Sequence, residues 1–146
     1  MLRAISGVIV SYIVLAIAVM LGFAALWFAF GVDGMLEPGS FKPTMTLNIG
    51  AVATSALGAI LGGAVCRAIT RSAKPPMVLA GIVLVLGMIA AAVTIRKPQP
   101  GVRAPDLPVM EAIRQGREPD WFAICNPLIG AAGVIAGSAI AKRGRP

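Results

Sequence analysis

Four long runs of apolar residues alternate along the chain with short segments that hold nearly all of its charged residues. The runs cover residues 4–30, 45–70, 76–95 and 121–141, and none has a charged residue in its central turns. Roughly 20 residues of α-helix cross the ~30 Å hydrocarbon layer of a bilayer, and each run reaches that length. The pattern therefore predicts an all-α, polytopic membrane protein built as a bundle of four transmembrane helices.

The segments between the runs differ in length and character. Residues 31–44 are rich in turn-forming residues, and residues 71–75 form a tight basic connection. Residues 96–120 are the only long connection, and we expect an extramembrane loop there, with a short amphipathic surface helix over residues 107–115. Too few residues remain outside the runs for a soluble domain, so residues 1–146 are interpreted as a single membrane domain.

Composition and charge agree with a membrane environment. The chain is 58% hydrophobic and only 13% charged, whereas about a quarter of the residues of a soluble domain are charged. Its net charge of +7 would suggest nucleic acid as the partner of a soluble protein. Here the basic residues flank the apolar runs, where they anchor lipid headgroups, and the basic segments lack aromatic residues that stack on bases. We therefore expect membrane lipids as partners and no nucleic acid.

The distribution of basic residues predicts the orientation. A plain count does not decide it, because seven basic residues lie on one side and six on the other. The segments around residues 71–75 and after residue 141 are basic and free of acids, on the same side as Arg3. Such segments stay in the cytoplasm, so we place both termini there, in a bacterial inner membrane. Trp27 and Trp121 then serve as anchors at the outer interface.

Small residues recur at a spacing of four on two of the runs, which places them on one face of each helix. Such a ridge lets two membrane helices approach closely. We expect the two ridges to pack against each other inside the monomer, and the alternative is that one of them mediates assembly with another chain. The candidate helix-packing residues are Gly50, Thr54, Gly58, Gly62, Gly133 and Gly137.

Asn126 and Pro127 lie about two turns into the fourth run. Proline removes a backbone hydrogen bond, so we expect a helix kink at this pair. Interrupted helices line the substrate sites of some transporters. A single proline kink is more often structural, and we favour that interpretation here.

The chain lacks the residues that most membrane-embedded chemistry requires. It has no histidine, and no acidic residue lies within a predicted span. Its two cysteines, Cys66 and Cys125, lie in different runs and cannot form a metal site by themselves. We therefore predict no catalytic, cofactor-binding or metal-binding residues and no soluble substrate, and we expect that the protein is not an enzyme.

These exclusions favour a non-catalytic accessory or assembly subunit of a larger membrane complex, with a respiratory or photosynthetic complex as the first host to examine. We expect residues 96–120 and the third helix to contact other membrane-protein subunits. The alternative is a small oligomeric transporter or channel. The two differ in that a transporter should form a homo-oligomer with a polar cavity that includes Asn126.

A reporter enzyme that is active only outside the cytoplasm tests the orientation. Fused after Pro146, it is expected to stay silent, because acid-free basic segments are retained in the cytoplasm. Reporter activity in that fusion would reverse the assignment.

Overall fold

The computed structural model describes residues 2–98, 101–104, 108–116 and 118–143. Within those ranges the fold is all-α, apart from an isolated β-bridge between Leu36 and Pro43. The helices are α1 (Leu2–Met35), α2 (Met45–Thr70), α3 (Lys74–Arg96), α4 (Val109–Gln115) and α5 (Asp120–Arg143). Helices α1, α2, α3 and α5 are long and apolar enough to cross a membrane. The predicted four-helix membrane bundle is confirmed.

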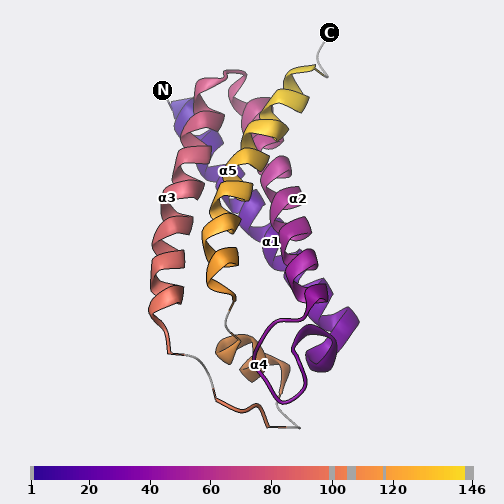
Figure 1. Cartoon of the computed structure of the whole chain (residues 1–146). Helices are drawn as coiled ribbons and strands as arrows, with labels where there is room; N and C mark the ends of the chain where they lie inside the picture. Colours follow the sequence, from indigo (N-terminus) through magenta and orange to yellow (C-terminus); the bar gives the residue numbers. More distant parts are fainter. Residues whose placement is uncertain (1, 99–100, 105–107, 117, 144–146) are drawn as a thin grey trace.

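Helices α2 and α5 form the centre of the bundle. α2 packs most extensively against α5 and also packs along α1, while α3 packs against α5 and touches α1 and α2 little. α1 crosses the bundle obliquely behind the other helices (Figure 1). Both described ends of the chain lie beside the turn between α2 and α3, which we call the basic end; α4 and the turn between α1 and α2 lie at the other, the loop end (Figure 1).

The backbones of α2 and α5 touch without intervening side chains. A Cβ atom on Gly63 would overlap the carbonyl oxygen of Val134, and one on Gly137 would overlap that of Ile60. Lipid tails are as apolar as the helices, so close packing drives helix association in a membrane. These glycines therefore fix the distance between the two central helices.

The ridge of small residues predicted on the second helix lies against α1. The pairs are Gly50 with Leu26, Thr54 with Gly22, Gly58 with Val19 and Gly62 with Leu15. The neighbouring ridge of α2, which includes Ala59 and Gly63, lies against α5, where it meets Gly133 and Val134. α2 thus presents small residues on two faces and contacts a different helix with each.

Local signals set the ends of α1 and α2. α1 was expected over residues 4–30; it begins at Leu2 and reaches Met35, with a break at Gly31, whose φ of 61° suits glycine. Thr44 caps α2: its hydroxyl donates to the carbonyl oxygen of Gly34 at 2.8 Å and accepts from the backbone N–H of Leu47 at 3.3 Å. The turn between the two helices is therefore shorter and more ordered than the sequence indicated.

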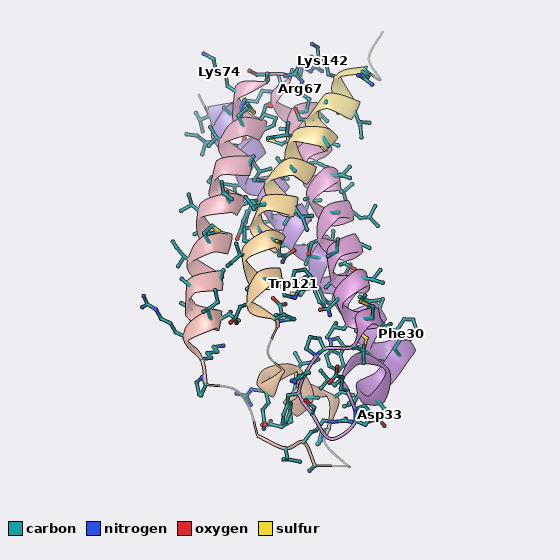
Figure 2. All side chains as sticks on the ribbon, viewed as in Figure 1. Phe30, Asp33, Arg67, Lys74, Trp121 and Lys142 are labelled. Carbon is teal, nitrogen blue, oxygen red and sulfur yellow. The ribbon has the colours of Figure 1, made fainter. Side chains whose placement is uncertain are left out.

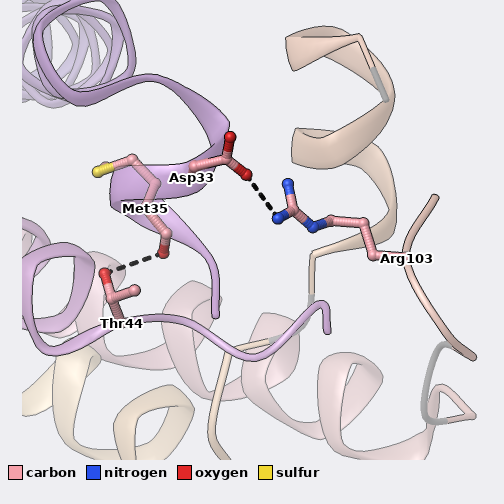
Figure 3. Close-up of polar contacts among 4 residues, drawn as sticks. All are labelled: Asp33, Met35, Thr44 and Arg103. Atoms are coloured by element: carbon pink, nitrogen blue, oxygen red, sulfur yellow. Dashed lines mark hydrogen bonds and ion pairs between the residues drawn. The ribbon is translucent and has the colours of Figure 1, made fainter. Parts of the chain in front are cut away.

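The long connection folds back over this turn. The side chain of Arg103 is only 5% exposed, and its Nη2 donates to Oδ1 of Asp33 at 2.7 Å, across 70 residues of sequence (Figure 3). The backbone N–H of Arg103 also donates to the carbonyl oxygen of Gly39 at 3.1 Å. α4 follows, and its Ala112 is buried with Trp27, Met35, Leu36 and Phe41. The described part of the long connection thus forms a cap on the loop end.

The glycine contact between α2 and α5 gives a stability prediction. Gly137→Ala is expected to lower the free energy of unfolding by about 1–3 kcal/mol, because the added methyl group must push the backbones apart. Gly81→Ala is the matched control: its Cβ would meet no atom within 4 Å, and alanine favours helix over glycine. Thermal unfolding in detergent should show a lower midpoint for the first variant only. Equal midpoints would contradict the packing.

Candidate binding cavity at the loop end

The two tryptophans predicted as interface anchors have different surroundings. Trp121 is 57% exposed, and its ring meets that of Phe122 edge to face at 5.7 Å. Trp27 is only 9% exposed, because the cap covers it. Figure 2 shows Trp121 at the end of α5 that faces the cap. Trp121 lies on the surface, and its role as an anchor stays a prediction, whereas Trp27 belongs to the interior of the loop end.

The pair Asn126 and Pro127 lies inside α5, which is helical from Asp120 to Arg143. The Pro127 ring packs against α3 at Gly87, where a Cβ atom would lie 2.7 Å from the proline Cβ. Asn126 Oδ1 is buried, and no described residue donates a hydrogen bond to it. A buried acceptor without a donor costs about 1–3 kcal/mol. The position of Asn126 therefore needs an explanation other than packing.

Asn126 lines a cavity of about 230 Å³ between the four spanning helices, which we call the central cavity. Most of its lining is small and apolar, and its polar members are Ser55, Thr94, Glu118 and Asn126. It reaches from Thr94 and Glu118 at the loop end as far as Ala59 on α2 and Gly130 on α5. Ala59 packs against Gly133 there, beside the backbone contact of Ile60 with Gly137. The cavity thus extends from the loop end to the contact of α2 with α5.

A second hollow, the aromatic pocket, lies beside the central cavity beneath the cap. It has a volume of about 400 Å³ and is lined from α1, α2, α5 and the cap. Its aromatic members are Phe23, Trp27, Phe41 and Phe122, and its polar members are Asn48 and Glu118. Aromatic rings bind apolar groups and also attract cations to their faces.

Glu118 lies where the central cavity and the aromatic pocket meet. It also lines a polar hollow at the surface together with Lys97 and Arg114. The residue is exposed, and the partial desolvation of its carboxyl group raises the pKa of that group above its ordinary value. The carboxyl group has no hydrogen bond or ion pair with another described residue. It is therefore available to a ligand that enters either hollow.

Two hydrogen-bond acceptors, the buried Asn126 Oδ1 and the carboxylate of the exposed Glu118, line the same cavity. Both can accept hydrogen bonds, and the carboxylate also attracts positive charge. The aromatic pocket beside them suits an apolar body. Among the described residues, no group of three or more His, Cys, Asp or Glu side chains could hold a metal ion.

Sequence reasoning identified Asn126 but missed Glu118. In the sequence Glu118 is one of several acidic residues of a long loop, and only the folding of that loop onto the bundle brings it over the cavity. Its place two residues before a membrane helix was the one local signal available.

We compared the chain with protein-family models, with curated proteins and with solved structures, and none of the three comparisons gives a match.

Glu118→Gln is expected to raise the midpoint of thermal unfolding at neutral pH. Burial raises the pKa of the Glu118 carboxyl group above its ordinary value of 4.5, so ionisation destabilises the folded state relative to the unfolded one. This penalty is absent below the ordinary pKa, grows between the ordinary pKa and the raised one, and is complete above the raised one. The rise in unfolding midpoint of Glu118→Gln over the unchanged protein, measured in detergent, should therefore become smaller as the pH is lowered. A gain that does not change with pH, or one equally large for Glu37→Gln, would contradict the burial of Glu118.

Proposed function

We propose that the chain is a small, non-catalytic membrane protein that binds an amphiphilic molecule with an amine-like head at the loop end of its bundle. Of the two functions suggested by the sequence, this favours the small oligomeric transporter or channel. The observation that carries the proposal is the central cavity, with Asn126 Oδ1 unpaired in its wall. A polar cavity that includes Asn126 was expected of a transporter and not of an accessory subunit; the central cavity includes Asn126, and most of the rest of its lining is apolar.

The chemistry of the cavity supports a polar ligand over a packing defect. A void lined only by apolar groups would leave no polar atom unsatisfied, whereas here the buried Asn126 Oδ1 lacks a donor among the described residues, and the Glu118 carboxyl group lines the same cavity. A primary amine supplies three donors when protonated and forms charge-assisted hydrogen bonds with a carboxylate. Its apolar substituent fits the neighbouring aromatic pocket.

Passage through the bundle requires a second conformation. The central cavity ends before the contact of α2 with α5, so these helices must separate or α5 must bend for a ligand to proceed. Helices bend at proline because a hydrogen bond is missing there. Pro127 stands in the cavity wall, which makes it the proposed point of bending. The basic end faces the cytoplasm of a bacterial cell in this proposal.

An accessory subunit is the second candidate, favoured by the exposure of α1. Of the 34 residues of α1 only Gly7, Ser11, Trp27 and Met35 are buried. A helix that buries so little of itself within its own bundle leaves room for helices of another subunit.

Purification in mild detergent separates the two candidates. The proposal predicts a homo-oligomer without other proteins, because transporters of this size need more helices than one chain supplies to enclose a path. A large particle with other subunits would instead establish the accessory role.

Binding of radiolabelled 2-phenylethylamine, measured by equilibrium dialysis, tests the site itself. Glu118→Gln is expected to weaken binding about tenfold or more, since it removes a charge-assisted hydrogen bond. Asn126→Leu should also weaken binding. The matched control is Glu37→Gln, which removes an exposed carboxylate at the same end of the molecule, outside both hollows. An equal loss in the control, or no loss in Glu118→Gln, would refute the site.

A further inference from the structure

Among the described residues, the charged side chains at the basic end are all positive. Its described basic residues are Arg3, Arg67, Arg71, Lys74, Lys142 and Arg143, and Figure 2 shows Arg67, Lys74 and Lys142 together at that end. Every described acidic residue lies at the loop end. Arg3 Nε donates to the carbonyl oxygen of Ile69 at 2.9 Å, which holds the start of α1 against the end of α2. The end thus presents an uncompensated field that attracts anions.

An apolar groove begins at this end between α1 and α3. These two helices touch little, and the space between them amounts to about 440 Å³. Its walls are apolar side chains of both helices, and Lys74 is its only charged member. The lining residues are Ala4, Ile5, Val8 and Ile9 of α1 with Pro75, Val78 and Ile82 of α3. The groove therefore starts beside a cation and continues as a hydrocarbon surface.

We propose that this groove binds one anionic phospholipid from the leaflet on the basic side, independently of the function proposed above. An acyl chain occupies the groove between α1 and α3, and the phosphate lies beside Lys74. The groove fixes the position of the lipid. It gives no preference among lipids, because any acyl chain fits an apolar surface. The preference for an anionic headgroup comes from Lys74, because one basic residue beside the headgroup strengthens binding to anionic lipid by roughly fivefold.

The dimensions favour a lipid over a helix of another protein. The lining residues span two turns or so of each helix, which corresponds to a length of about 10 Å. An α-helix with its side chains is about 10–12 Å across, too wide for a hollow of 440 Å³ that is shared between two helices. A single extended acyl chain is much thinner. A partner helix would also need an acidic residue beside Lys74, which an anionic lipid supplies through its phosphate.

Lipid titration with native mass spectrometry tests the proposal on the full chain in detergent. Phosphatidylglycerol and phosphatidylcholine with the same acyl chains are the two ligands. Phosphatidylglycerol is expected to bind at least fivefold more tightly than phosphatidylcholine. Lys74→Gln should weaken the binding of phosphatidylglycerol by about that factor and leave the binding of phosphatidylcholine unchanged. Lys142→Gln is the matched control, since Lys142 lies at the same end but outside the groove.

A variant that fills the groove separates the site from general surface charge. Val78→Trp is expected to weaken both lipids, because it blocks the space for the chain while all charges remain. Equal binding of the two lipids, or an equal loss in Lys142→Gln and Lys74→Gln, would overturn the proposal. The unfolding midpoint of each variant shows whether weaker lipid binding results from misfolding. If Val78→Trp is misfolded, Ala4→Leu at the opposite wall of the groove is used in its place.

Discussion

The direct contact between the backbones of α2 and α5 determines the positions of the other helices. Gly63 and Gly137 allow it, because no side chain separates the two helices at these points. α1 then lies along the second small-residue face of α2, and α3 lies along α5 through the pairs of Gly87 with Pro127 and Val83 with Gly130. Because lipid is itself apolar, the hydrophobic effect does not drive the helices together, and their close geometric fit holds the bundle instead.

The central cavity follows from the limits of that contact. Toward the loop end the two central helices no longer touch through backbone atoms alone, and the ring of Pro127 lies between α5 and α3. The space that remains is bounded by small residues, which cannot fill it. The cap adds Glu118 to its lining, so a hollow between the spanning helices reaches an ionisable group outside them. The contact of α2 with α5 thus accounts both for the packing of the bundle and for the position of the central cavity.

The sequence was sufficient for the spans and insufficient for the contacts between them. Apolar runs report directly on membrane crossing, and their limits agree with the helices to within a few residues except at the end of α1. The small residues of α2 were recognised, but helical spacing does not say which neighbour each face meets. Trp27 has the same sequence signature whether lipid or a folded loop covers it. The pairing of Arg103 with Asp33 depends on residues far apart in the chain, and Glu118 acquires its surroundings only through that folding.

The length of α1 ties the shape of the loop end to the membrane around it. The part of α1 before its break at Gly31 is about 44 Å long, whereas the hydrocarbon layer is about 30 Å thick. α1 meets this difference by running obliquely (Figure 1), which brings it near α3 at the basic end and away from α3 at the loop end, beside the aromatic pocket. A thinner bilayer increases the tilt of such a helix and a thicker one reduces it. We therefore expect bilayer thickness to act on the width of the pocket, so that the lipid composition of the host membrane would act on the protein mechanically.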